Sequence, residues 1–254
     1  SFIGTCRKIK QWVSLTGNRY IALGTTKKTY VISGTSFIDV TPIRVTTAAG
    51  DATFSASDGS STLTVNETGH NAIAGDFVTF SGAASLGGNI TADVLNQEYE
   101  IAAISSANAF TITAKDTSGA TVTANSSDTG NGGSSTVAAF QISIGEDVAV
   151  PGGGWGAGTW GSGTWGTAVG DDVTNTLRLW SLDNFGEDLV LNARLGAIYL
   201  WDATNPTTRA KELSTITNAV DPPQEVLQIV VSTQDRHVLA IGCNPFGATD
   251  IDLM

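Results

Sequence analysis

The chain of 254 residues is 41% hydrophobic and 15% charged, and it carries a net charge of −11 at pH 7. This composition is typical of a globular protein that buries a core, and it excludes an intrinsically disordered chain. It also excludes nucleic-acid binding through overall charge attraction. No apolar run approaches the roughly 18 residues of a membrane span, so we expect no stable membrane association.

Near the N-terminus, the sequence predicts four short strands at residues 8–15, 19–25, 28–34 and 36–43. Turn residues such as Gly17 separate them. The second strand is an apolar run, as expected of an inner strand that is buried on both faces. We predict that residues 1–44 form a first propeller-like blade. This segment is basic, with seven Lys and Arg residues against the single acid Asp39, and it faces either an acidic neighbour or solvent.

A different pattern occupies residues 45–145. Apolar and polar residues alternate at 52–65, 75–83, 98–105, 109–115, 120–126 and 136–144, and the first of these segments turns at Asp58-Gly59. Strands with one apolar and one polar face suit a small β-sandwich or barrel. We predict a β-domain inserted into a loop between blades, where insertion costs little because the loop ends are close and exposed.

Three tryptophans stand five residues apart in the stretch GGGWGAGTWGSGTWG, within a Gly-rich loop at residues 146–172. Exposed indoles are an aggregation liability, and indoles are strong interface anchors. Trp155, Trp160 and Trp165 are therefore our candidate interface residues, which anchor the loop on their own domain or on a neighbouring subunit. A sugar-binding tip and a mobile linker remain as alternatives.

Residues 173–254 return to the pattern of the N-terminal strands. A second set of strands is predicted at 176–182, 187–193, 197–203 and 209–216, and a third set begins at 225–232 and 236–242. The two sets are in register at roughly 49 residues, from Leu177 to Val226, which is near the period of a four-stranded propeller blade. The prediction is an all-β chain of partial β-propeller-like blades with an inserted small β-sandwich or barrel domain.

The number of blades predicts a larger protein. A propeller needs at least four blades to close a ring, and the sequence supplies about two and a half. The chain also opens on Ser1 and has its single methionine at Met254. We therefore expect it to be a piece of a longer polypeptide, or a processed product.

Motifs of catalysis and metal binding are missing: the sequence has no GxSxG elbow, no HExxH motif, no P-loop and no CxxC pair. We expect His70 in a solvated loop and His237 at the edge of a strand. Cys6 and Cys243 are expected to be small buried hydrophobic residues. The sequence therefore predicts no metal, no cofactor and no enzymatic activity.

Asp183, Glu187 and Asp188 form the one carboxylate group that invites a catalytic interpretation, because glycosidases use a pair of carboxylates. A polar hairpin turn between two blade strands explains the same residues, with Asn184 and Gly186 supplying the turn geometry. We favour the turn, and a propeller hydrolase acting on polysaccharide remains the competing hypothesis.

Two segments of the blades, GTTKKTYVISGTSFIDVTPIR and LRLWSLDNFGEDLVLNARLGAIYLWDAT, resemble the nozzle or hub proteins of short-tailed bacteriophages. These proteins are also called tail tubular protein B or DNA-stabilisation proteins. The segment GDFVTFSGAASLGGNITADVLNQEYEIAAISSANAFTITA is similar to a small β-domain of phage virion proteins. The resemblance covers roughly residues 10–44, 73–114 and 177–245.

The resemblance implies a structural role in the virion tail, with assembly in the host cytoplasm. It implies a homo-oligomeric ring, six subunits in relatives, that contacts the tail adaptor and the tail fibre or spike proteins. DNA would pass through the ring without sequence-specific binding, and an acidic chain suits a conduit that must not grip phosphates. The alternative is a receptor- or glycan-binding virion module that uses the inserted domain or the Trp-rich loop.

Overall fold

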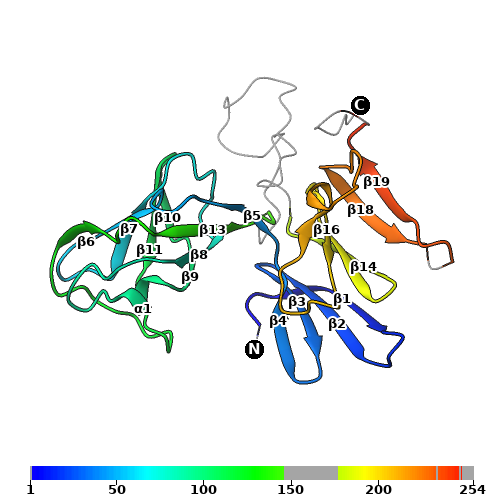
Figure 1. The fold of residues 1–254 in the computed structure, drawn as a ribbon, viewed down its shortest axis with the longest axis horizontal. Helices are drawn as coiled ribbons and strands as arrows, with labels where there is room; N and C mark the ends of the chain where they lie inside the picture. Colours follow the sequence, from blue (N-terminus) through cyan, green and yellow to red (C-terminus); the bar gives the residue numbers. More distant parts are fainter. Residues whose placement is uncertain (1, 146–176, 233, 246, 248–254) are drawn as a thin grey trace, which may run out of the picture. The chain divides into compact units, whose positions relative to one another are not determined.

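The computed structural model describes residues 2–145, 177–232, 234–245 and 247. Its regular structure is almost entirely antiparallel β-sheet, which confirms the predicted all-β class. The chain divides into two compact units (Figure 1). One unit combines the residues up to Pro42 with those from Ile144 onward, and the other is Ile43–Ser143. No helix in the described ranges is long and apolar enough to cross a membrane.

The first unit begins with a four-stranded antiparallel sheet, called sheet 1 below, whose strands follow chain order: β1 (Cys6–Val13), β2 (Arg19–Thr25), β3 (Thr29–Ser33) and β4 (Ser36–Asp39). Trp12 pairs with Tyr20, which fixes the register of β1 against β2. β4 ends before the predicted boundary because the Asp39 carboxylate accepts the Thr41 N–H at 3.0 Å, in place of a strand partner.

Sheet 2 has the same order: β14 (Trp180–Phe185), β15 (Asp188–Ala193), β16 (Ile198–Trp201) and β17 (Lys211–Glu212). β15 is buried on both faces, as its apolar sequence predicts. Gly186 has a φ of 69° in the turn between β14 and β15, which confirms the predicted hairpin. The strand predicted at 209–216 is wrong beyond Glu212, where a 3₁₀ turn (Leu213–Thr215) follows. The Thr215 hydroxyl donates to the Glu212 carbonyl at 2.7 Å and competes with strand pairing.

The third element of this unit is a two-stranded hairpin, β18 (Val226–Val231) and β19 (Val238–Cys243). The first strands of the three groups lie in a row, since β1 packs against β14 and β14 packs against β18 (Figure 1). The first unit thus holds two chain-ordered four-stranded antiparallel sheets followed by a hairpin.

The second unit contains two sheets. One has the order β10 (Ala103–Ser106), β11 (Ala109–Thr113), β7 (Thr62–Asn66), β6 (Thr53–Ala56) and β12 (Asp128–Asn131), and the other has β5 (Ile43–Thr46), β13 (Val137–Gln141), β8 (Phe77–Ser81) and β9 (Glu98–Glu100). A single helical turn, α1 (Ala92–Leu95), precedes β9 and is capped by the Thr91 side chain. The sequence places an inserted domain at 45–145, and this compact unit runs from Ile43 to Ser143.

An apolar core joins the two sheets of this unit. Phe54 and Phe80 meet edge to face, with ring centroids 4.8 Å apart, and Phe110 meets Phe140 in the same way at 5.8 Å. Aromatic pairs in this geometry contribute about 0.5–1.5 kcal/mol beyond their buried area. The alternating Phe residues of the predicted strands therefore do meet in one core.

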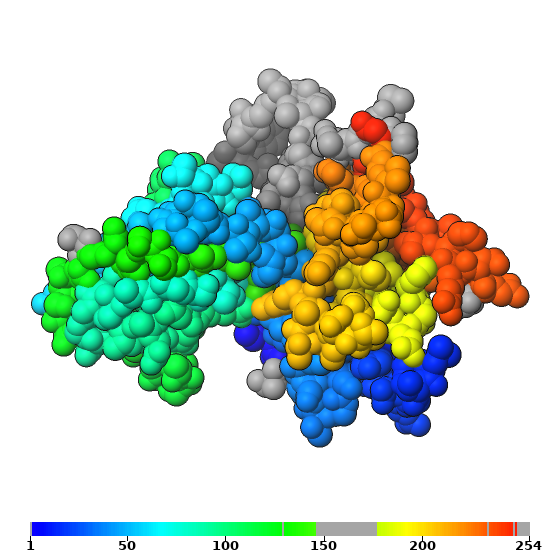
Figure 2. All heavy atoms as spheres, in the orientation of Figure 1, coloured from blue at the N-terminus to red at the C-terminus, as the bar shows by residue number. Residues whose placement is uncertain are grey.

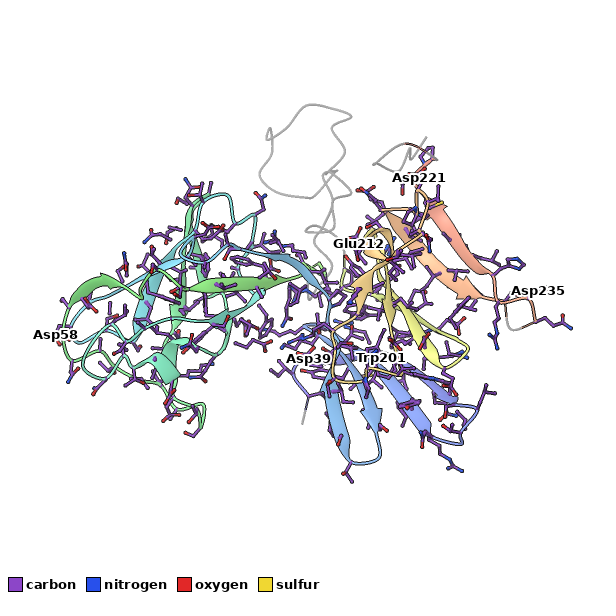
Figure 3. All side chains as sticks on the ribbon, viewed as in Figure 1. Asp39, Asp58, Trp201, Glu212, Asp221 and Asp235 are labelled. Carbon is purple, nitrogen blue, oxygen red and sulfur yellow. The ribbon has the colours of Figure 1, made fainter. Side chains whose placement is uncertain are left out.

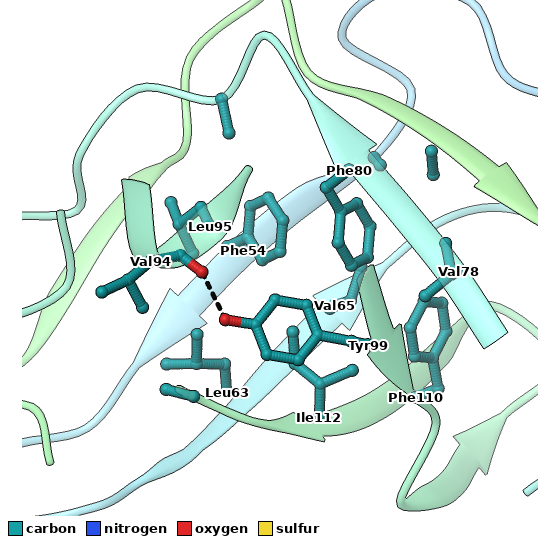
Figure 4. Close-up of a cluster of buried hydrophobic side chains, with 14 of the residues drawn as sticks. Phe54, Leu63, Val65, Val78, Phe80, Val94, Leu95, Tyr99, Phe110 and Ile112 are labelled. Atoms are coloured by element: carbon teal, nitrogen blue, oxygen red, sulfur yellow. Dashed lines mark hydrogen bonds between the residues drawn. The ribbon is translucent and has the colours of Figure 1, made fainter. Parts of the chain in front are cut away.

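Tyr99 is a polar exception within this core (Figure 4). Its hydroxyl donates to the Val94 carbonyl at the end of α1 and accepts the Lys115 N–H at 3.4 Å. Burial raises the pKa of Tyr99, although the hydrogen bond with Lys115 opposes that shift. The tyrosine thus fixes α1 and the loop after β11 to the same point of the core.

Tyr99→Phe should lower the free energy of unfolding of the second unit by about 1–2 kcal/mol, because a buried carbonyl loses its donor while the packed ring remains. The change is measured by urea denaturation. Tyr199→Phe in sheet 2 is a suitable comparison, since Tyr199 is a buried tyrosine of the first unit whose hydroxyl holds no carbonyl of the second unit. A Tyr99→Phe transition unchanged from wild type would contradict this account.

One further prediction for the second unit is wrong, and one strand of this unit was not predicted. Residues 120–126 form no strand, because Val122 and Ala124 donate their N–H groups to the carbonyls of Ala114 and Ser60 instead of to a strand ladder. The edge strand is β12, whose sequence DTGN reads as a turn and which pairs with β6 through an irregular register. Pairing from the neighbouring strand outweighs the weak local propensity of this segment.

Candidate functional site

The candidate interface residues Trp155, Trp160 and Trp165 lie outside the described residues. The polar and aromatic groups that the structure does bring together sit where sheet 1 meets sheet 2. This contact surface, called the inter-sheet junction below, holds three other tryptophans, Trp12, Trp180 and Trp201. The carboxylates of the competing catalytic hypothesis, Asp183, Glu187 and Asp188, lie at or next to this junction.

Trp180 fits against Gly24 at one end of the junction. A Cβ atom at position 24 would lie 2.5 Å from Cγ of Trp180, so only glycine allows the indole to pack on β2. The indole Nε1 donates to the Thr25 carbonyl at 2.7 Å, and Arg178 Nη1 donates to the Thr26 carbonyl at 2.8 Å. Residues at the start of sheet 2 therefore bind the backbone of sheet 1 at the end of β2.

Trp12, Tyr20 and Trp201 fill the other end of the junction. Trp12 stacks on Tyr20 at 5.3 Å, and Trp201 meets both rings edge to face at 6.4 and 5.8 Å. Trp12 Nε1 donates to the Glu187 carbonyl at 2.8 Å. Trp201 is thus a fully buried packing residue of this junction.

Asp183 links three neighbouring strands. One carboxylate oxygen pairs with Lys10 Nζ of β1 at 2.7 Å, and the other accepts the Val231 N–H of β18 at 2.9 Å. Burial alone would raise the pKa of Asp183, but the hydrogen bond and charge of Lys10, together with the Val231 N–H, lower it below the ordinary aspartate value. Asp183 is therefore held in its charged form, and it connects β14 to β1 and to β18.

Glu187 and Asp188 also bind backbone groups. Glu187 Oε1 accepts the Leu15 N–H at 2.8 Å, and Asp188 Oδ1 accepts the Ala203 N–H at 2.9 Å. Burial raises the pKa of Asp188, and the nearby charges of Asp202 and Glu187 raise it further, whereas the Ala203 hydrogen bond opposes the shift. All three carboxylates of the hypothesis therefore have structural partners in the turn and the strands beside it.

Asp183→Asn should remove stability that depends on pH. Because the folded-state pKa of Asp183 is lowered, its contribution is present above the ordinary aspartate value of 3.8 and is lost as the pH falls through the folded-state value. The stability difference between wild type and Asp183→Asn should be largest near pH 6 and should shrink below about pH 4. Thermal unfolding followed by circular dichroism between pH 6 and pH 3 measures it.

Asp188→Asn provides a matched control with the opposite sign. The raised pKa of Asp188 means that its charged form disfavours folding, so the amide should preserve or increase stability at neutral pH. This gain should disappear in acid, where wild-type Asp188 is protonated. Parallel pH profiles for the two variants would contradict the assignment of opposite roles.

A further charged network was not predicted from the sequence. The Lys28 side chain is only 2% exposed, and its Nζ lies 2.7 Å from Asp39 Oδ2, while Arg209 Nη1 lies 2.7 Å from Asp39 Oδ1. Figure 3 labels Asp39 in the first unit. Asp39 also accepts the Thr41 hydroxyl at 2.7 Å. Lys28 and Asp39 are 11 residues apart in sequence. Arg209, however, follows the inserted unit in the sequence and is 170 residues from Asp39, so no local pattern indicates the network.

Beside this network, sheet 2 carries a polar cleft of about 680 Å³ whose lining includes Asp188, Asp202, Arg209 and Lys211. Hydrogen bonds from the side chains of Thr204 and Asn205 lower the pKa of Asp202. The cleft thus offers two acidic and two basic groups. In the described part of the chain, no three His, Cys, Asp or Glu side chains are grouped as a metal site requires.

The prediction of a solvated His70 is wrong. His70 is buried, its Nδ1 accepts the Ala72 N–H at 3.1 Å, and Nε2 lies 3.1 Å from the Ser106 carbonyl. Its ring packs edge to face on Phe110, and the two hydrogen bonds replace the water that the loop position suggested. Its backbone carbonyl also accepts a hydrogen bond from Arg44.

The cysteines differ from their prediction as well. Cys6 is exposed, and Cys243 is half-buried, and both are free thiols. Cys6 begins β1 and Cys243 ends β19, where Cys243 still packs against the apolar cluster that contains Val226. His237 is exposed at the turn that precedes β19.

No protein-family model matches this chain, and no curated protein matches it. Among solved structures, the phage phi92 endosialidase aligns with a TM-score of 0.27 and 14% sequence identity, over 81% of this chain and 30% of that chain. The chain therefore spans less than a third of the length of that structure.

Proposed function

We propose that this chain is a structural protein of a bacteriophage tail, and that it forms part of the nozzle or hub that extends the DNA ejection channel. In this proposal, copies of the chain form a closed ring next to the tail adaptor, and DNA passes through the ring without sequence-specific contacts. Six copies per ring are expected from the sequence resemblance. The tail fibre or spike proteins contact the same assembly.

The observation that carries the proposal is the row of first strands β1, β14 and β18. The two complete sheets coincide with the segments that resemble nozzle proteins, and their chain-ordered antiparallel strands are compatible with propeller blades. The second unit has its own core and lies in the chain between the two sheets, as expected of a domain carried by a blade loop.

The surroundings of the candidate carboxylates also favour a structural role. Asp183, Glu187 and Asp188 each accept a backbone N–H from a neighbouring strand or loop, so folding alone accounts for their presence. The net charge of −11 suits the wall of a channel that DNA must leave freely.

Negative-stain electron microscopy of the native assembly that contains this chain tests the proposal. We expect rings or tapered tubes with an axial hole, attached to capsids or to adaptor rings. Separate monomers or slender trimeric fibres would overturn it. In that case the glycan-binding alternative would be tested on glycan arrays, with Trp160→Ala as the variant that should lose binding.

A further inference from the structure

The loop between β7 and β8, residues 67–76, is organised around the side chain of His70. This loop lies at the surface of the second unit (cyan in Figure 2). His70 itself is buried, and its ring packs on Phe110 of β11. Nδ1 accepts the Ala72 N–H at 3.1 Å, and Nε2 lies 3.1 Å from the carbonyl of Ser106 at the end of β10. The imidazole therefore connects the loop with itself and with the neighbouring hairpin.

These two contacts hold the imidazole in its neutral form. A ring nitrogen that accepts an N–H carries no proton, so the proton of the neutral ring is on Nε2, which donates to the Ser106 carbonyl. Protonation would add a hydrogen to Nδ1, and two donors, Nδ1–H and the Ala72 N–H, would then face each other. The bond to Ala72 therefore exists only while His70 is uncharged.

A partner for a protonated ring lies in the same loop. Glu67 Oε2 is buried, and no described residue donates a hydrogen bond to it. Burial raises the pKa of Glu67, a positive charge on His70 lowers it, Asp51 raises it and Arg44 lowers it. Glu67 and His70 are therefore close enough to interact. A cation at position 70 would supply the partner that this carboxylate oxygen lacks.

The other charged group beside His70 is Arg44 of β5, whose guanidinium donates to the His70 backbone carbonyl. Burial lowers the pKa of Arg44, and the charges of Asp76 and Glu67 oppose that shift. The groups that β10 and β11 place against the ring, a backbone carbonyl and a phenyl ring, do not titrate. Arg44 thus disfavours a second cation next to it and Glu67 favours one, so the charge of His70 depends on the balance between them.

The backbone next to His70 is restrained by the same bond. Asn71 has a φ of 45°, in the left-handed region that costs energy for a residue with a side chain, although asparagine tolerates this region better than most. The bond from the Ala72 N–H to the ring spans Asn71. Loss of that bond removes a restraint from Asn71, so the backbone favours release.

We propose that His70 is an acid-sensitive latch of the second unit: the neutral ring holds the loop through the Ala72 N–H, and the protonated ring releases this bond and turns to Glu67. Histidine is the side chain that ordinarily changes its charge between about pH 5 and pH 8. The stability that the Ala72 bond contributes is therefore present at neutral pH and is lost as the pH falls through the titration of His70. The latch acts within the second unit and does not depend on the proposed function.

Amide hydrogen exchange of the full chain, followed by NMR at about pH 7.5 and about pH 5.5, tests the latch. The Ala72 amide should lose protection on the order of tenfold or more at the lower pH, after correction for the intrinsic exchange rate, because one buried hydrogen bond is lost. The amides of β7 and β11, which pair with each other in the core, should keep their protection. In parallel, the ¹H–¹⁵N spectrum of the imidazole should change from the Nε2–H form to the imidazolium form.

Three variants assign the effect to this pair of residues. His70→Asn keeps a side-chain oxygen that can accept the Ala72 N–H but does not titrate, so its Ala72 amide should be equally protected at both pH values. Glu67→Gln removes the carboxylate that receives the protonated ring, so the loss of protection should move to lower pH. His237→Asn changes the exposed histidine of the first unit and is the matched control, which should behave like wild type.

Three results would overturn the latch. If the protection of the Ala72 amide in the wild type is the same at both pH values, His70 is a packing residue only. If His70→Asn shows the same loss as the wild type, another group causes it. If the amides of β7 and β11 lose protection together with that of Ala72, acid unfolds the whole unit and no separate latch exists.

Discussion

Replacing Trp201 by alanine should lower the free energy of unfolding of the first unit by about 3–5 kcal/mol, the range for deleting a large buried aromatic side chain. Trp201 is the largest fully buried side chain of the described residues, and it contacts Trp12 and Tyr20 across the inter-sheet junction. Its removal leaves a cavity at the point where sheets 1 and 2 meet. Guanidinium denaturation followed by tryptophan fluorescence measures the loss.

The result has a spatial signature. Because the second unit has its own core, the hydrogen-exchange protection of β7 and β11 should be unchanged in Trp201→Ala, while that of β2 and β15 should fall. Leu15→Ala removes an exposed leucine and should change stability by less than about 0.5 kcal/mol. Equal effects of the two substitutions would show that the inter-sheet junction contributes little.

Asp39→Asn should cost about 3–5 kcal/mol, because it removes the negative partner of a buried ammonium group. The side chain of Lys28 is buried against Asp39, and the guanidinium of Arg209 binds the same carboxylate. An asparagine keeps the shape but leaves two cations close together without this anion. Urea denaturation near pH 7 measures the loss.

A double-mutant cycle assigns the effect. Lys28→Met in the Asp39→Asn background should recover much of the lost stability, because the buried charge is then removed as well. Asp58→Asn alters an exposed aspartate at a hairpin turn of the second unit and should have little effect. If Asp39→Asn is as mild as Asp58→Asn, the network is a surface feature and not a buried one.

Strand periodicity and turn residues carried most of the fold prediction. The apolar inner strand β15 is predictable from the sequence because burial on both faces requires an unbroken apolar run. β12 and α1 escaped prediction because their formation depends on partners. β12 is held by pairing with β6, and α1 is a single turn that Thr91 caps and Tyr99 anchors.

The candidate site was predictable only in part. The turn around Asp183, Glu187 and Asp188 follows from Asn184 and Gly186, but the partners of these carboxylates come from β1, β18 and distant loops. The burial of His70 depends on Phe110 and on the Ser106 carbonyl, which folding brings to it from another hairpin. Such long-range contacts leave no trace in local spacing.

The pairing of β5 with β13 bears on how this chain folds. Ile43, where the second unit begins, pairs with Gln141, two residues before that unit ends. Paired residues of neighbouring strands have Cα atoms about 5 Å apart. The two ends of the folded second unit are therefore close together, although about 100 residues separate them in the sequence. Once the second unit has folded, sheet 1 and sheet 2 are separated by a much shorter effective length of chain. The loop-closure entropy of bringing the two sheets together is then set only by the residues between Ser143 and the start of β14 at Trp180.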